Sequence, residues 1–213
     1  MDSYQEELTF ARLLVRRAGN VLKNARHDTQ VVKQPHGFSY LDVTTTADLE
    51  SETLILEGIS ARYPTDRIMS EETRSFENEG KGRLWIVDPL DGTTNFVKGL
   101  DAYAVSIALV VDGLVVAAAC YLPEQDEDYT AVRGVGVCRN GEPLPLLSPT
   151  DTLAGSLVSV GFPHSRDSAT LAQAFDMYHD VLVNCSDLRR SASAVLDGCV
   201  LATGATGAYL TPD

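Results

Sequence analysis

The sequence predicts a layered α/β fold, of the α+β type, from the order of its hydrophobic patterns. The first 62 residues carry two helical patterns, and a meander of strand-like runs with turn signals follows up to about residue 141. The remainder alternates between strand and helix patterns. Helices first, then strands, then a mixture of both are typical of a sandwich in which helices cover sheets.

Two helices are expected at the start of the chain. Apolar residues recur every three or four positions from Leu8 to Ala25, which predicts an amphipathic helix. A second helical pattern covers Asp48 to Arg62 and must end before Pro64, because proline disfavours the helical conformation of the residue before it.

The middle of the chain predicts a sheet. Leu84–Val87 is an apolar run expected to be a strand buried on both faces, and Arg67–Ser70 reads as a shorter strand before it. Asp112-Gly113 lies between two β-branched runs, which is a strong hairpin signal. A further antiparallel pair and a following turn are expected at Tyr129–Val132 with Val135–Cys138 and at Asn140-Gly141.

The last part of the chain predicts alternating elements. Leu157–Gly161 and Asp187–Arg190 read as strands, and Leu171–Leu182 reads as a helix between them. A final helix is expected at Ser193–Thr203, closed by Gly204, since glycine readily adopts the left-handed conformation that ends helices.

Composition limits the classes of function. The chain has 213 residues, 44% of them hydrophobic and 22% charged, which indicates an ordered globular protein. Its net charge of −13 disfavours nucleic-acid binding and favours divalent cations as the source of positive charge near a phosphate. The longest apolar run is interrupted at Asp112, and no secretory signal is visible, so we expect neither a membrane span nor export, but a cytoplasmic protein with reduced cysteines.

The segment from Asp88 to Asn95 carries the strongest chemical signal. Pro89 and Gly92 favour a tight turn that can aim the Asp88 and Asp91 carboxylates and the Leu90 carbonyl at one point. These oxygens are ligands suited to Mg²⁺. Gly92 and Thr93 then offer backbone N–H groups to an anion. The alternatives are an ordinary surface turn at Asp88-Pro89 and a Thr93 that only caps a helix.

Four further acids are weaker candidates when taken alone. Glu71 and Glu72 follow an expected strand, and adjacent acids are most often a solvated loop. Asp42 and Asp48 flank a run of threonines, and Asp48 is also suited to cap the second helix.

Together these segments resemble the inositol monophosphatase family. The resemblance rests on Asp42–Asp48, Ile68–Glu72 and the long string Trp85–Phe96, with a looser match at Arg189–Tyr209. It implies a layered αβαβα sandwich, a homodimer, and Mg²⁺-dependent hydrolysis of a small-molecule phosphate monoester by a metal-activated water. The substrate it implies is inositol-1-phosphate-like or a sugar phosphate.

The resemblance also implies roles by position. Glu71, Asp88, Asp91 and the Leu90 carbonyl match metal ligands, while Asp48 and Thr93 match the pair that activates water. Glu71, Gly92 and Thr93 match residues that contact the phosphate or the substrate. The stretch Ala192, Ser193 and Ala194 matches residues that contact the alcohol part of the substrate.

The chain departs from the family near its C-terminus. The family carries one more metal-binding Asp in a Trp-Asp motif, and no such motif is present up to Asp213. We therefore expect one domain over 1–213, with a metal-binding part at about 1–145 and an incomplete α/β part at about 146–213. The alternative function is a truncated, non-catalytic homologue that serves as a dimerisation or partner-binding module.

Overall fold

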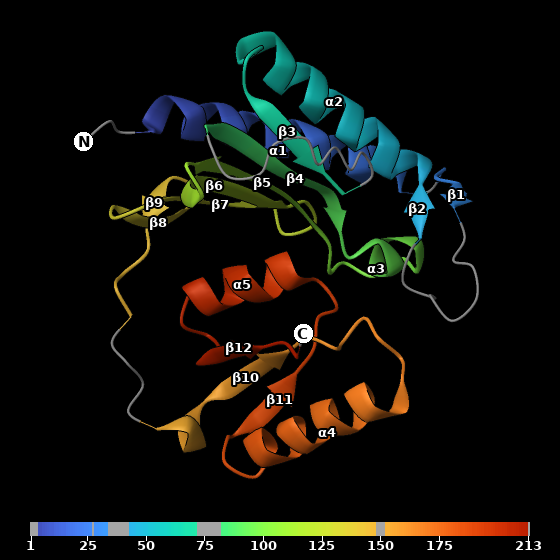
Figure 1. The fold of residues 1–213 in the computed structure, drawn as a ribbon, viewed down its shortest axis with the longest axis vertical. Helices are drawn as coiled ribbons and strands as arrows, with labels where there is room; N and C mark the ends of the chain where they lie inside the picture. The colour runs from blue at the N-terminus through green and yellow to red at the C-terminus, as the bar shows by residue number, and fades with distance from the viewer. Residues whose placement is uncertain (1–3, 27, 34–42, 72–81, 148–151, 213) are drawn as a thin grey trace.

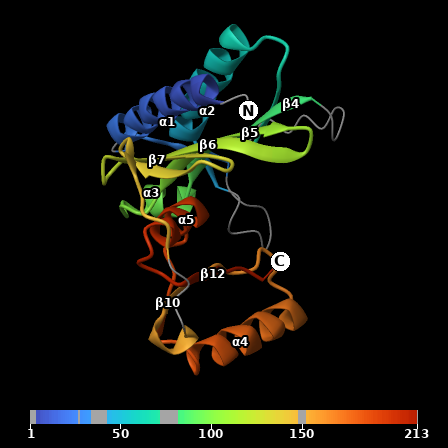
Figure 2. The ribbon, with the colours of Figure 1, turned by 90° about the vertical axis from the view of Figure 1, so that its left-hand side faces the viewer.

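The layers alternate between helices and sheets along one axis of the molecule. The computed structural model describes residues 4–26, 28–33, 43–71, 82–147 and 152–212. Helices α1 (Gln5–Ala25) and α2 (Thr46–Arg62) cover one face of a large sheet, and α5 (Ala194–Ala202) lies against its other face (Figure 1). A small sheet and α4 (Ser168–Leu182) follow beyond α5 (Figure 2). This order is the αβαβα sandwich that the sequence predicts.

The large sheet has seven strands, and its neighbours follow the order of the chain. Only β3 and β4 run parallel, and the other adjacent pairs are antiparallel. The strands are β3 (Arg67–Ser70), β4 (Arg83–Asp91), β5 (Ala104–Val111), β6 (Leu114–Leu122), β7 (Glu127–Val132), β8 (Gly136–Arg139) and β9 (Glu142–Pro143).

The small sheet is parallel and has the order β11-β10-β12. Its strands are β10 (Leu157–Val160), β11 (Asp187–Arg189) and β12 (Ala208–Leu210). The sequence did not predict β12. The remaining elements are the antiparallel pair β1 (Val31–Lys33) and β2 (Thr44–Thr45), the short helix α3 (Thr93–Val97) and the 3₁₀ turn η1 (Leu153–Gly155).

The expected hairpins are confirmed, and the backbone angles give the reason. Asp112 and Gly113 join β5 to β6 with φ angles of 50° and 81°, so both adopt the left-handed conformation that two-residue hairpin turns require. Asn140 and Gly141, between β8 and β9, have φ angles of 52° and 85°. Asparagine, aspartate and glycine tolerate this region better than other residues do.

Three separate hydrophobic clusters hold the layers together. The first packs α1 and α2 on the large sheet and includes the buried side chains of Leu14, Ile55 and Trp85. The second joins α5 to the opposite face of the sheet through Leu122, Leu196 and Cys199. The third fills the space between the small sheet and α4. Each of these three interfaces therefore has its own apolar contacts.

Two expectations about β4 are corrected. The strand does not end at Val87 in a tight turn but continues to Asp91, with an irregular register between Asp88 and Asp91. Pro89 is tolerated there because the regular ladder is already interrupted. The strand is also not fully buried on both faces, since Trp85 and Val87 are buried while Leu84 and Ile86 are only half-buried.

Two helix starts also differ from the sequence expectation. Helix α2 begins at Thr46 and α4 begins at Ser168, because Thr45 and Asp167 accept hydrogen bonds from the first free N–H groups of each helix. Within the described ranges no helix has the length and apolar character needed to cross a bilayer.

Candidate metal and phosphate site

Glu71 and Asp88 meet at the ends of two parallel strands. The register of β3 and β4 pairs Ser70 with Val87, so the next residue of each strand is an acid. Burial raises the pKa of Asp88 well above its ordinary value, and the nearby carboxyl groups of Asp91 and Glu71 raise it further. Glu71 also acts as a hydrogen-bond partner of Asp88. The structure therefore places like charges together where water screens them poorly.

Asp91 faces the neighbouring helix layer. Its Oδ2 accepts hydrogen bonds from Ser193 Oγ at 2.5 Å and from the Val195 N–H at 2.7 Å. Burial raises the pKa of Asp91, while these donors at the start of α5 act in the opposite direction. The first turn of a helix stabilises a carboxylate in this way because its N–H groups have no partner within the helix.

The three acids are neighbours but are not arranged as a complete ligand shell. Among the residues that the structure describes, no group of three or more His, Cys, Asp or Glu side chains is placed to hold a metal ion. One oxygen of Asp91 instead accepts hydrogen bonds from Ser193 and Val195 at the start of α5. Asp42, Glu72 and Asp213 lie outside the described residues.

Asp48 connects the start of α2 to Thr93. Its Oδ2 accepts hydrogen bonds from the Thr45 N–H at 2.9 Å and from the Thr45 hydroxyl, while its Oδ1 lies 3.4 Å from Thr93 Oγ1. Thr45, not Asp48, is the N-cap of α2, and together they form a capping box. Asp48 is only 3% exposed, so its carboxylate is fixed between two threonines.

Gly92 and Thr93 begin the short helix α3. Gly92 has a φ angle of 88° and is the N-cap, so Thr93 is the first helical residue and not the cap. A Cβ at Gly92 would lie 2.8 Å from the Ala102 carbonyl oxygen, which leaves room only for glycine. The hydroxyl of Thr93 lies 3.0 Å from the Leu90 carbonyl oxygen, an expected metal ligand.

A cavity of about 970 Å³ contains most of these groups. One wall comes from β3, β4 and α3, and the other comes from the segments after β10 and β11. The expected site residues that line it are Glu71, Asp88, Leu90, Asp91, Gly92, Thr93 and Ala192. Asp48 is not among the residues that line the cavity, and its contact with Thr93 connects it to them.

The other two residues of the expected alcohol-binding stretch take different positions. Ser193 is 1% exposed, and its hydroxyl donates to Asp91 and caps α5 by accepting from the Leu196 N–H. Ala194 is exposed and its N–H contributes to the environment of Asp91. Of the three residues, Ala192 is the one that lines the cavity.

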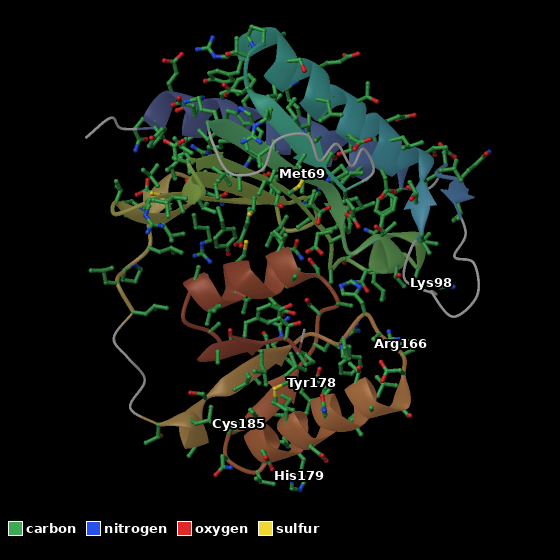
Figure 3. All side chains as sticks on the ribbon, viewed as in Figure 1. Met69, Lys98, Arg166, Tyr178, His179 and Cys185 are labelled. Carbon is green, nitrogen blue, oxygen red and sulfur yellow. The ribbon has the colours of Figure 1, made fainter. Side chains whose placement is uncertain are left out.

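Sequence reasoning missed a group of residues on the second wall. Phe162, His164, Arg166 and Arg190 line the cavity from loops far along the chain from Asp88. Arg166 lies on the loop that leads into α4 (Figure 3). The available signal was one basic residue a few positions after an expected strand and another at the end of the next expected strand, in an acidic chain.

Asn95 was also missed, and it joins the two walls. Its Nδ2 donates to the Ala102 carbonyl at 2.6 Å and to the Ser191 carbonyl at 2.8 Å. Asn95 is 6% exposed, so both of its donors are satisfied within the protein. This side chain fixes the approach of the β11–α5 loop to α3.

Comparison with known sequences identifies relatives over nearly the whole chain. The sequence profile of the inositol monophosphatase family matches residues 3–213. The Nus factor SuhB of Pasteurella multocida is 38% identical over 205 residues, which make up 95% of this chain and 74% of the relative. The Nus factor SuhB of Escherichia coli is 34% identical over 92% of this chain and 73% of its own length.

Solved structures agree with this relationship. An inositol monophosphatase from Anabaena is 30% identical, with a TM-score of 0.83 over 97% of this chain and 75% of that one. The extragenic suppressor protein suhB from Bartonella henselae is also 30% identical, with a TM-score of 0.83 over 94% of this chain and 76% of that one. The chain thus spans about three quarters of these relatives.

Proposed function

Because the chain belongs to the inositol monophosphatase family, we propose that it hydrolyses small-molecule phosphate monoesters with the help of Mg²⁺. The observation that carries the proposal is the meeting of Glu71 with Asp88 beside the start of α3, in one cavity. An acidic cluster of this kind holds its charges together best around a cation. The inositol-1-phosphate-like and sugar phosphates expected from the sequence are the substrate classes to test.

The donor atoms fit a hard divalent cation. Glu71, Asp88, Asp91 and the Leu90 carbonyl offer oxygen ligands only, as Mg²⁺ prefers. The raised pKa of Asp88 supports this assignment, because an excess of negative charge is what a cation would relieve. The hydrogen bonds from Ser193 and Val195 both end on Asp91 Oδ2, so Oδ1 would be the oxygen that Asp91 offers to a cation. Bound Mg²⁺ would supply Lewis-acid stabilisation of phosphate charge and lower the pKa of water.

Protein groups supply the remaining chemistry. Thr45 fixes the Asp48 carboxylate. The single hydroxyl proton of Thr93 has two acceptors in reach, the Leu90 carbonyl at 3.0 Å and Asp48 Oδ1 at 3.4 Å, and a cation on the Leu90 carbonyl would leave that proton to Asp48. The lone pairs of Thr93 Oγ1 are then directed to accept a proton from the attacking water, with Asp48 as its final acceptor. The N–H groups of Gly92 and Thr93 would bind phosphate oxygens, and Ala192 would contact the alcohol.

The experiment is a phosphate-release assay on a panel of sugar, polyol and nucleoside phosphates, with Mg²⁺ and with EDTA. We expect hydrolysis that EDTA removes and that Asp88→Asn lowers at least about 100-fold, since loss of groups around a metal site commonly costs 10- to 100-fold. Asp176→Asn, at an exposed position on α4, is the matched control. Hydrolysis that persists in EDTA, or an active Asp88→Asn protein, would refute the proposal.

A second candidate is a non-catalytic, partner-binding protein. The observation that favours it is that the relatives from P. multocida and E. coli are both named Nus factors. If the panel shows no hydrolysis while the chain captures a defined protein partner, this function replaces the first.

The remaining predictions concern organisation. We propose that residues 1–213 act as one domain, because Asn95 and Asp91 bond the part up to 145 to the part from 146 onward. Three expectations stay predictions: the protein forms a homodimer, it is cytoplasmic, and it binds no nucleic acid. Light scattering coupled to gel filtration tests the dimer.

A further inference from the structure

Two arginines on the second wall of the cavity are placed differently from most others in the protein. Arg166 lies on the loop after β10 and Arg190 on the loop after β11, and both line the cavity that holds Glu71 and Asp88. Arg166 lies on the loop that leads into α4 (Figure 3), and Arg190 follows β11 of the small sheet, while Asp88 lies on β4 of the large sheet. A molecule that occupies this cavity is therefore exposed to acids on one wall and guanidinium groups on the other.

Neither guanidinium group has a carboxylate partner among the described residues. Arg166 Nη1 donates to the Pro163 carbonyl at 3.2 Å, and the guanidinium carbon of Arg190 lies 4.4 Å from the centre of the Phe162 ring. By contrast, Arg12, Arg16 and Arg83 each form an ion pair with an Asp or Glu at 3.0 Å or less.

Such arginines are unexpected in a chain that has 30 acidic and 17 basic residues, where carboxylates are plentiful. Guanidinium groups match phosphate and carboxylate groups in geometry as well as charge. Two of them beside one cavity, with neither paired to a carboxylate of residues 4–26, 28–33, 43–71, 82–147 or 152–212, are suited to an anion from outside the protein.

Arg190 is also held in place before any anion arrives. Phe162 supports it from one side, and the ring of Phe162 packs near Phe175 and Tyr178, with ring centres 6.2 Å and 5.6 Å apart. Stacking on an aromatic ring reduces the number of conformations that the guanidinium group must lose on binding. Both arginines keep further N–H groups, and a guanidinium group suits a ligand that accepts two hydrogen bonds at once.

We propose that the substrate carries a second anionic group, a phosphate or a carboxylate, which Arg166 and Arg190 bind while the first phosphate occupies the acidic part of the cavity. The inference rests on the proposed phosphatase function and narrows its substrate class. A polyol phosphate with only hydroxyl groups would leave both arginines without a charged ligand, so we expect it to be the poorer substrate.

The test compares esters that differ by one anionic group. Glucose 6-phosphate is matched with glucose 1,6-bisphosphate, and glycerol 2-phosphate with 2-phosphoglycerate. Each is assayed on wild type, Arg166→Gln, Arg190→Gln, the double variant and Arg133→Gln. Arg133 lies in the exposed turn between β7 and β8, away from the cavity lining, and serves as the control.

In wild type we expect a higher kcat/KM for the doubly anionic esters. The double variant should lower that value about 10- to 100-fold, mainly through KM, because a charge-assisted pair contributes to binding before chemistry. The singly charged esters and Arg133→Gln should change less than about twofold. A loss confined to the bisphosphate identifies phosphate as the second group, while a loss shared with 2-phosphoglycerate shows that either anion is accepted.

Equal losses for singly and doubly anionic esters, or no loss at all, would overturn the inference. Arg166→Gln loses only a bond to a backbone carbonyl, so its result does not depend on the stacking that Arg190 provides. If wild type hydrolyses none of the esters, the proposed function fails, and calorimetry decides this inference separately. Glucose 1,6-bisphosphate must then bind more tightly than glucose 6-phosphate in wild type and lose that advantage in the double variant.

Discussion

Asp88 couples the stability of the fold to the chemistry of the site. Burial and the neighbouring acids raise its pKa in the folded protein above the value of the unfolded chain. The folded state therefore holds the proton more tightly, and the stability that this group contributes is present at low pH and lost as the pH rises through the folded pKa. Above that pKa, the metal-free site carries the charge of Asp88 beside the Asp91 and Glu71 carboxyl groups.

Asp88→Asn should remove this pH-dependent contribution to the free energy of unfolding. With EDTA present, we expect the melting temperature of the variant to rise relative to that of wild type as the pH is raised from 4 to 8, because only wild type loses the contribution of a protonated Asp88. Thermal unfolding across that range measures it. A difference in melting temperature that stays the same across that range would show that the Asp88 charge is already compensated within the protein.

Thr93 tests the proposed route of the proton. Thr93→Ala removes the hydroxyl that lies 3.4 Å from Asp48 Oδ1, so we expect kcat to fall about 100-fold or more while KM stays within a few fold. Thr93→Ser retains the hydroxyl and should keep most of the activity. Steady-state kinetics that show a rise in KM alone would assign Thr93 to substrate binding instead.

Among the elements, helix α5 has the closest connection to the site. Its N-terminal turn holds the Asp91 carboxylate through Ser193 and Val195, which links the middle helix layer to the end of β4. The same serine caps the helix by accepting from the Leu196 N–H. One hydroxyl therefore stabilises both the helix and a buried acid.

Ser193→Ala should lower the free energy of unfolding by roughly 2–4 kcal/mol, the sum expected for a lost helix cap and a lost hydrogen bond to a charged group. Asp167→Ala removes the exposed cap of α4 and should cost about 1 kcal/mol. Chemical denaturation of both variants gives the comparison. If Ser193→Ala costs no more than Asp167→Ala, its bond to Asp91 adds nothing to stability.

The junction of β4 and α3 depends on Gly92 in a similar way. Gly92→Ala brings a Cβ to 2.8 Å from a backbone oxygen in addition to the strained φ angle of 88°. Gly134, with a φ angle of 75°, has open space around it, so Gly134→Ala isolates the backbone term of roughly 1–2 kcal/mol. We expect Gly92→Ala to destabilise the protein by at least about 1 kcal/mol more, and equal unfolding free energies would contradict the close contact.

At the scale of the whole molecule, the site lies where the layers meet. The large sheet supplies Glu71, Asp88 and Asp91, and the loops of the small sheet supply Arg166 and Arg190. Separate hydrophobic clusters hold these layers, so each wall of the cavity has its own support. Asn95 and Ser193 provide the polar links between the walls.

The elements were predictable because their signals are local. Helical spacing located α1 and α2, and Asp112-Gly113 identified the β5–β6 hairpin from its conformational preference alone. The continuation of β4 past Pro89 was not predictable, because it depends on pairing with β5, which the local Asp-Pro pattern does not report. The same holds for β12, whose strand character depends on a parallel neighbour.

The site was predictable only in part. The string from Trp85 to Phe96 gathers several of its residues within one segment, so their proximity needed no knowledge of the fold. The role of Ser193 as a partner of Asp91, and the position of Arg190 opposite Asp88, depend on segments about a hundred residues apart. Such contacts are set by how the layers pack, and no periodicity in the sequence encodes them.

The central claim is that Glu71, Asp88 and Asp91 bind a divalent cation together. Isothermal titration calorimetry of Mg²⁺ into metal-free protein, in two buffers with different ionisation enthalpies, tests it most directly. We expect binding that weakens as the pH falls, with proton release that grows over the same range, because protons compete with Mg²⁺ for the Asp88 carboxylate, whose pKa is raised. Asp88→Asn should lose this binding while Asp176→Asn keeps it. Absence of binding to wild type, or equal binding to Asp88→Asn, would contradict the claim.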